Sequence, residues 1–304
     1  METLWKNDLP DTFGPMIAKE LRQSLRRGSF VLPFLGIQLL ALAAMIAEFR
    51  AGRSPASSEF NGMLNLVMLW TSGPFWLVVS IVCMILMPLG GVILMSEELE
   101  EGNHELLLLT HITRWKAVLG KFVALWGLCV VTFVSLLPYV VVRYMIGGIE
   151  WWHEAACALT VLGCSAMIGA GAIGASAFGG IGARVAVLFL FLGSMVAGAS
   201  VPLIASAGVS GGCGILYHLT AAAAVFCYTA IGLALARSRL LFAVMSYEAR
   251  PGALIIALSI FSPFLIWVIT GITAGWGGVA GLLVVGLVVT GINTAPKVID
   301  PART

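Results

Sequence analysis

The chain has 304 residues, of which 60% are hydrophobic and only 11% are charged, with a formal net charge of +2. Soluble domains carry roughly 45 to 50% apolar and about 25% charged residues, so a soluble globular protein is excluded and an integral membrane protein is indicated. The small net charge also argues against a nucleic acid as a partner. Because the apolar runs are continuous rather than alternating, we expect membrane-spanning helices and not a barrel.

The first 28 residues have the pattern of an amphipathic helix that lies in the headgroup layer. Pro15 begins the segment, and apolar residues follow one side of it while charged residues cover the rest. Basic residues on such a helix are attracted to anionic lipid. No cleavage site of small residues follows, so the segment is not expected to be a signal peptide. The charged positions assigned to this surface helix are Lys19, Glu20, Arg22, Arg26 and Arg27.

Eight apolar runs are long enough to cross a bilayer, since about 20 residues span the roughly 30 Å hydrocarbon layer. They are Phe30 to Phe49, Met63 to Met95, Ala117 to Ile146, Ala155 to Phe178, Val185 to Ser206, Gly214 to Ala236, Ala253 to Thr273 and Gly277 to Ala295. Pro74, Pro88 and Pro138 are expected to kink or open their helices. The predicted fold is therefore an all-α polytopic membrane protein with about eight transmembrane helices.

The distribution of basic residues predicts the orientation, because loops rich in Lys and Arg stay in the cytoplasm. With the N-terminus inside, fourteen of the 17 Lys and Arg residues fall in inward segments, and only Arg50, Arg53 and Arg143 fall outward. Both termini and the segment from Ser96 to Lys121 are then cytoplasmic.

Ionisable residues inside the spans would mark an ion-coupled carrier, because a charge near the bilayer midplane is costly and is kept for function. The carboxylates here fall near predicted interfaces: Glu48, Glu59, Glu150, Glu154 and Glu248. Arg143 lies close enough to the outer surface that we expect its side chain to snorkel to water. The sequence therefore predicts no ion-coupling site.

The fourth span contains Gly169-x-Gly171-x-x-Gly174, which matches a dinucleotide fingerprint in spelling. It lacks the surrounding strands, and no acidic residue occurs between Glu154 and Glu248 to bind a ribose. We interpret these glycines as sites of close helix packing.

Other enzymatic and metal sites are not supported by the spacing. His104 and His111 are seven residues apart, whereas a helical zinc pair needs a spacing of four. The Glu-Glu-x-x-x-Arg pattern of membrane CAAX-type proteases is absent after either glutamate pair. No phosphate-binding Gly-x-x-x-x-Gly-Lys-Ser/Thr loop occurs either, so the chain itself is not expected to bind ATP, a metal or another cofactor, or to act as an enzyme.

The segment from Ser96 to Lys121 is polar although it lies between two apolar runs. It holds five of the 15 acidic residues within nine positions, and basic residues follow. Its glutamates, then Gly102-x-x-Glu105-Leu-Leu-Leu, then Thr-Arg-Trp and Val-Leu-Gly-Lys121 resemble the loop between the second and third membrane helices of type 2 ABC exporter permeases, the ABC-2 type. His111 stands where that family has a proline, and the family core has six spans instead of eight.

In that family the loop is a coupling helix that contacts a separate ATPase subunit. The resemblance implies the same contact for Glu97, Glu98, Glu101, Gly102, Glu105, Leu106, Leu107, Thr113, Arg114 and Lys121. It further implies that the surface helix is the family's elbow helix, that ATP and Mg are bound by the partner, and that the permease pairs with itself or with a sister permease. The expected location is the cytoplasmic (inner) membrane of a bacterium.

The resemblance also suggests how the chain is divided. Residues 1–29 form a cytoplasmic N-terminus with the elbow helix, residues 30–236 a six-span core with its coupling loop at 96–121, and residues 237–304 a cytoplasmic loop, two added spans and a short tail. The predicted function is the permease subunit of an ABC exporter. The alternatives are a membrane assembly or scaffold protein and an ion-coupled secondary transporter.

Overall fold

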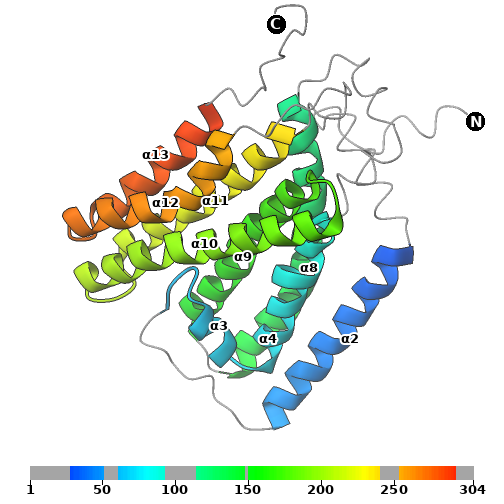
Figure 1. Ribbon diagram of the computed structural model, residues 1–304. Coiled ribbons are helices and arrows are strands. Elements are labelled where there is room, and N and C mark those ends of the chain that lie inside the picture. Colours follow the sequence, from blue (N-terminus) through cyan, green and yellow to red (C-terminus); the bar gives the residue numbers. More distant parts are fainter. Residues whose placement is uncertain (1–27, 51–60, 93–113, 148–149, 240–252, 292–304) are drawn as a thin grey trace, which may run out of the picture.

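The computed structural model describes residues 28–50, 61–92, 114–147, 150–239 and 253–291. All regular elements in these ranges are helices, as the continuous apolar runs predict (Figure 1). They are α2 Gly28–Arg50, α3 Leu66–Thr71, α4 Pro74–Ser80, the π-helical turn η2 Ile81–Leu86, α5 Met87–Leu89, α8 Arg114–Gly147, α9 Trp151–Ser176, α10 Ile181–Ser210, α11 Ile215–Arg239, α12 Ala253–Ile272 and α13 Gly277–Gly291. The predicted elbow helix lies outside the described residues.

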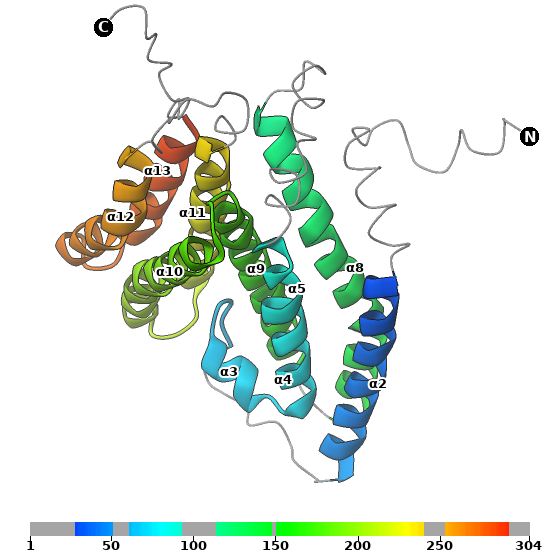
Figure 2. The ribbon, with the colours of Figure 1, turned by 45° about the vertical axis from the view of Figure 1, so that its right-hand side comes forward.

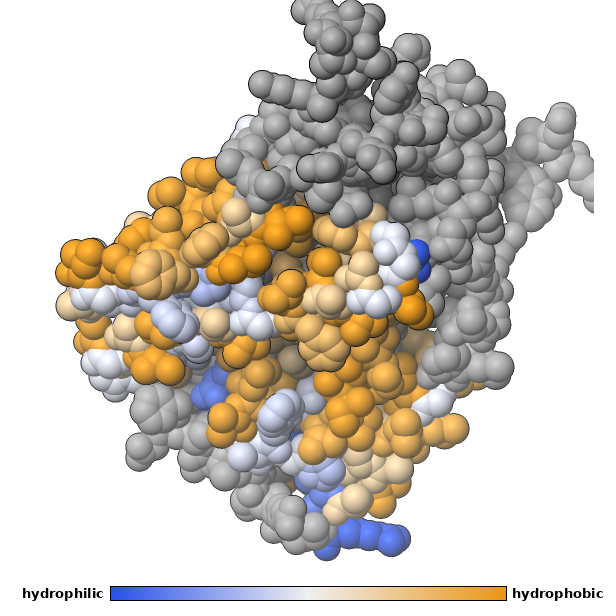
Figure 3. All heavy atoms as spheres, in the orientation of Figure 1, coloured by the Kyte–Doolittle hydropathy of each residue, from blue (hydrophilic) through white to orange (hydrophobic). Residues whose placement is uncertain are grey.

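The helices form a bundle that is built to lie in lipid. Four of them, α8 to α11, are long and apolar enough to cross a membrane. Apolar side chains on several helices are exposed, and Leu39, Phe189 and Phe264 are each more than half exposed. Apolar residues make up most of the described surface on the face shown in Figure 3. A water-soluble protein does not expose so large an apolar area, so the chain is a multi-pass membrane protein. The exact number of crossings stays a prediction.

α9 lies at the centre of the bundle, and small residues let its neighbours approach closely. A Cβ atom on Gly174 would lie 2.7 Å from the carbonyl oxygen of Gly232 in α11, so the two helices meet backbone to backbone. The ring of Phe191 in α10 similarly fills the space beside Gly171. The packing interpretation of these glycines is therefore confirmed.

The second predicted span differs most from the structure. Instead of one helix from Met63, the chain forms the short helix α3, breaks at Ser72-Gly73, and begins again with Pro74 at the start of α4. Gly73 has a φ of 122°, which a residue with a side chain rarely adopts, and Pro74 disfavours helical backbone in the residue before it. The prediction that Pro74 opens the helix was correct, but the break separates two helices of different direction.

Residues 61–72, here called the re-entrant segment, enter the bundle and return at the same end. Asn61 contacts His153 in the first turn of α9, and the amide of Leu64 donates to Thr160 Oγ1, seven residues further along that helix. That is about 10 Å at roughly 1.5 Å per residue. The chain reverses at Leu64, which has a φ of 67°, and Ser72 again contacts His153. Asn65 caps α3 by accepting a hydrogen bond from the amide of Met68.

The two ends of the bundle differ in charge. At one end the guanidinium of Arg237, near the end of α11, lies 5.5 Å from the ring centre of Trp115, near the start of α8. Arg184 lies in the first turn of α10 and donates to the carbonyl oxygen of Phe178. The opposite end holds α4 and the end of α2 (Figure 2), and there Glu48 of α2 and Glu154 of α9 both pair with Arg143. Which of the two ends faces the cytoplasm stays a prediction.

Candidate functional site

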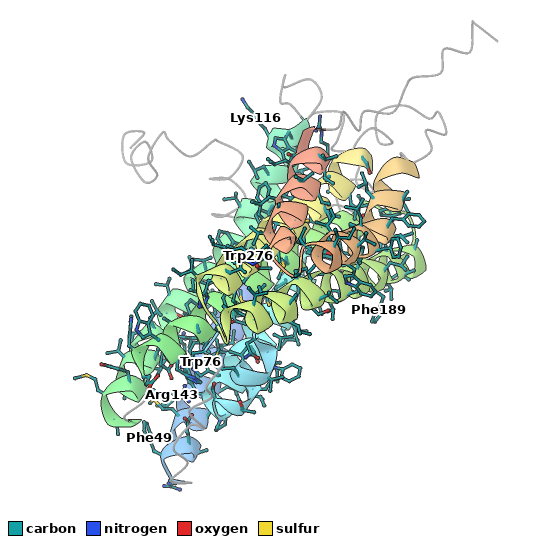
Figure 4. The ribbon with its side chains drawn as sticks, turned by 90° about the vertical axis from the view of Figure 1, so that its left-hand side faces the viewer. Phe49, Trp76, Lys116, Arg143, Phe189 and Trp276 are labelled. Atoms are coloured by element: carbon teal, nitrogen blue, oxygen red, sulfur yellow. The ribbon has the colours of Figure 1, made fainter. Side chains whose placement is uncertain are left out.

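The predicted ATPase contacts fall mainly outside the described residues. Glu97 to Leu107 and Thr113 belong to the undescribed range 93–113, and the elbow positions belong to 1–27. Of the remaining two, Arg114 begins α8 and Lys121 lies two turns into it, where its side chain is buried. The neighbouring Lys116 is exposed at the basic end of the bundle (Figure 4).

The structure instead reveals a buried cluster of charges at the other end of the bundle, around Arg143 in α8. The guanidinium of Arg143 is 1% exposed and forms ion pairs with two carboxylates. Its Nε donates to Glu48 Oε1 at 2.9 Å, and its Nη1 donates to Glu154 Oε1 at 2.7 Å. Because the partners lie on α2 and α9, this one side chain joins three helices.

Two further groups form hydrogen bonds with this ion-pair cluster. Arg143 Nη2 donates to the carbonyl oxygen of Ser72, at the break between α3 and α4. The indole of Trp76 in α4 donates to Glu154 Oε2 at 3.0 Å, so both oxygens of that carboxylate are hydrogen-bonded. Arg143 and Trp76 lie together at the end of the bundle away from Lys116 (Figure 4).

The backbone at Gly73 makes room for the carboxylate of Glu48. A Cβ atom at position 73 would lie 2.9 Å from all three carboxyl atoms of Glu48. The same glycine has the positive φ that reverses the chain. The break in the second span and the ion-pair cluster therefore depend on one residue.

A chain of neutral and ionisable groups extends from this cluster toward the surface. His153 Nε2 lies 2.7 Å from Ser72 Oγ, and His153 Nδ1 lies 2.9 Å from Asn61 Oδ1. The amide nitrogen of Asn61 in turn donates to Oε2 of Glu150, which is exposed. His153 itself is buried, so the imidazole is connected to water only through its neighbours.

The cluster lies at interfacial depth, but its arginine does not snorkel. Tyr144 packs edge-on against Trp151, and these side chains and Trp152 are exposed, as aromatic residues are where a membrane helix meets the headgroup layer. Glu48, Glu150, Glu154 and Arg143 are predicted to lie near a membrane interface, and the exposed aromatic residues next to them are consistent with that position. The predicted snorkelling of Arg143 is wrong, because the guanidinium finds carboxylates inside the bundle and needs no water.

This cluster differs in two ways from an ion pair that has balanced charges and a hydrogen bond to every carboxylate oxygen. It contains two buried carboxylates and one guanidinium, so the charges of these three groups do not balance. Glu48 is 5% exposed, yet among the described residues none donates to its Oε2. Ionisable residues that are buried in membrane segments often belong to functional sites. The ion-pair cluster is therefore the candidate functional site of this protein. The described ranges contain no group of three His, Cys, Asp or Glu side chains placed to bind a metal.

No family model, no curated protein and no solved structure matches the chain.

Proposed function

We propose that the chain is the membrane-spanning permease subunit of an ABC exporter in a bacterial inner membrane. In this proposal the segment from Ser96 to Lys121 is the coupling helix, and Glu101, Gly102 and Glu105 contact a separate ATPase subunit. Glutamates on this surface would pair with basic residues of the partner, which orients the two subunits and speeds their association. The observation that carries the proposal is the motif in this loop, with its acidic residues between two apolar segments.

The helices on either side of the loop support this assignment. The chain leaves α5 and returns at Arg114, and Arg114 begins α8 at the basic end of the bundle. Basic ends face the cytoplasm, where ATP is available. The loop therefore connects at the end where a cytoplasmic ATPase would bind.

α8 offers a mechanical connection between the loop and the rest of the bundle. It is one continuous helix of 34 residues, and Arg143 follows Arg114 by 29 positions, or about 44 Å. A movement of its cytoplasmic end would be carried to Arg143, which joins α8 to α2, to α9 and to the re-entrant segment.

Replacement of Glu101 and Glu105 by Lys tests the coupling contact. The reversed charges would face the partner's basic residues, so ATP-dependent transport in reconstituted vesicles should be lost while the permease stays folded. Glu59→Lys, on the predicted outer side, is the matched control and should leave transport unchanged. Unchanged coupling in the double variant, or a purified permease that never retains an ATP-binding subunit, would refute the proposal.

An ion-coupled secondary transporter is the second candidate, and the buried cluster is the observation that favours it. Such carriers keep ionisable groups inside the membrane to bind the driving ion. Uptake that follows an ion gradient in vesicles without ATP would identify this function. Transport that stops when ATP is removed and continues when the gradient is collapsed would exclude it.

A further inference from the structure

The hydrogen bonds around Ser72 leave its hydroxyl group with one hydrogen for two neighbours. Ser72 Oγ lies 2.6 Å from the carbonyl oxygen of Met68, which can only accept, and 2.7 Å from His153 Nε2. When the hydroxyl donates to Met68, the hydrogen between Ser72 and His153 has to come from Nε2. A neutral imidazole with a bare Nε2 would leave one of these two short contacts without a hydrogen.

The other ring nitrogen of His153, Nδ1, also lies within hydrogen-bonding distance of an acceptor. Asn61 directs its amide nitrogen toward the carboxylate of Glu150, so its Oδ1 is the atom that faces His153 Nδ1 at 2.9 Å. An amide oxygen cannot donate, so Nδ1 carries a hydrogen. Both ring nitrogens then donate, which is the hydrogen-bonding pattern of an imidazolium cation.

A proton on His153 also balances the charges of the cluster. Glu48 and Glu154 supply two negative charges, and Arg143 with a protonated His153 supplies two positive charges. Charged groups face this site from α2, through Glu48, from α8, through Arg143, and from α9, through Glu154 and the exposed Glu150. The re-entrant segment and α4 contribute the neutral groups Asn61, Ser72 and Trp76, and α9 adds the thiol of Cys157, 3.5 Å from Ser72 Oγ. An excess buried charge is costly in a low dielectric, so uptake of one proton stabilises this arrangement.

Glu154 and Glu48 are the other groups that could take this proton, but the surroundings of His153 fit it better. Both oxygens of Glu154 already accept hydrogen bonds, from Arg143 and from Trp76. Protonated Glu48 would carry its hydrogen on Oε2, where none of the described residues provides a partner, or on Oε1, which already accepts from Arg143. A buried donor without an acceptor is costly. The ring of His153 by contrast has an acceptor at each nitrogen.

We propose that Glu48, Arg143, His153 and Glu154 form a proton-binding site, with the exchangeable proton on Nε2 of His153. Release of that proton leaves Nε2 as an acceptor. The hydroxyl of Ser72 then turns from Met68 to His153, while the carbonyl oxygen of Met68 keeps its bonds from the amide of Ser72 and the hydroxyl of Thr71. Proton occupancy thereby sets the direction of the hydrogen bond between Ser72 and His153. The inference concerns the outer end of the bundle and does not depend on the ATPase partner.

The experiment observes His153 directly in the full chain. The protein has four histidines, so replacing His104, His111 and His218 by Gln leaves His153 as the only one without altering the site. The variant is labelled with ¹⁵N in its imidazole, purified in detergent and titrated by NMR. We expect both ring nitrogens to be protonated at low pH and Nε2 alone to lose its proton as the pH rises. A ring that is neutral at every pH at which the protein stays folded would overturn the proposal.

Asn61→Asp in the same background places a carboxylate against Nδ1. Because this favours the charged ring, the midpoint of the titration should move up by about one to three pH units. The matched control is Asn65→Asp, which adds a carboxylate to the re-entrant segment at the capping position of α3, where Asp is well tolerated. A midpoint that Asn61→Asp leaves in place, or that Asn65→Asp moves equally, would contradict the assignment.

Discussion

Replacement of Arg143 by Met is expected to destabilise the folded protein by about 3 to 5 kcal/mol, because it leaves Glu48 and Glu154 buried without their cation. The carbonyl oxygen of Ser72 loses its donor in the same step. The loss should appear in the free energy of unfolding, measured in mixed detergent micelles. The re-entrant segment should also become more susceptible to proteolysis, since Arg143 joins it to α8.

Arg50→Met is the matched control, since Arg50 is an exposed arginine at the end of α2 and the change should cost little. Adding Glu48→Gln and Glu154→Gln to Arg143→Met should recover part of the loss, because the amides carry no charge and the side chain at 154 can still accept from Trp76. If Arg143→Met is as stable as Arg50→Met, the ion-pair cluster does not hold the helices together. A triple variant no more stable than the single one would show that unpaired charge is not the cause.

Gly73→Ala should destabilise the folded protein by about 2 to 4 kcal/mol. The added methyl group would lie 2.9 Å from the carboxylate atoms of Glu48, closer than such atoms normally approach, and the positive φ at this residue is strained for alanine. Glu48 would then have to leave Arg143 or the turn would have to open. Either outcome should lower the unfolding temperature and expose the re-entrant segment.

Gly180→Ala separates the two causes. Gly180 also has a positive φ, of 80°, but a Cβ atom there meets nothing within 4 Å. This control bears the backbone strain without the collision and should cost less than Gly73→Ala, about 1 to 2 kcal/mol. Equal effects of the two substitutions would mean that the contact with Glu48 contributes nothing to stability.

Most helices of the bundle could be predicted from the sequence, because an apolar run of bilayer length has one stable solution in lipid. The run from Ala117 to Ile146 became α8, and the run from Ala253 to Thr273 became α12, each within a few residues of the predicted ends. The all-α fold and the membrane-embedded location are therefore confirmed. The division into a six-span core and an added pair, and the contacts of the coupling loop, stay predictions.

The re-entrant segment could not be predicted from hydropathy, since Met63 to Met95 is apolar throughout whether or not it reverses. The local signals were present in the sequence: Asn65 as a cap and Ser72-Gly73-Pro74 as a break. What they could not show is the direction of α3. That direction depends on hydrogen bonds to His153 and Thr160, which lie 81 to 96 positions away in the chain.

The ion-pair cluster was missed because each charge was judged alone. Glu48 near the end of one span, Arg143 near the end of another and Glu154 near the start of the next all fall at the same membrane depth. Opposite charges at one level of a helix bundle predict pairing, since pairing avoids the cost of an isolated charge. The unpaired oxygen of Glu48 and the hydrogen count at Ser72, by contrast, require coordinates.

The end of the bundle at which α8 begins should face the cytoplasm, and the end with the Arg143 cluster should face outward. Single cysteines at the exposed positions Lys116 and Arg50 test it with a thiol reagent that cannot cross the membrane of intact cells. Cys213 is replaced by Ser beforehand, because it alone of the six cysteines is not buried. Arg50→Cys should react in intact cells, and Lys116→Cys should react only after permeabilisation. Labelling of both positions from the same side, or of Lys116→Cys alone in intact cells, would contradict the account.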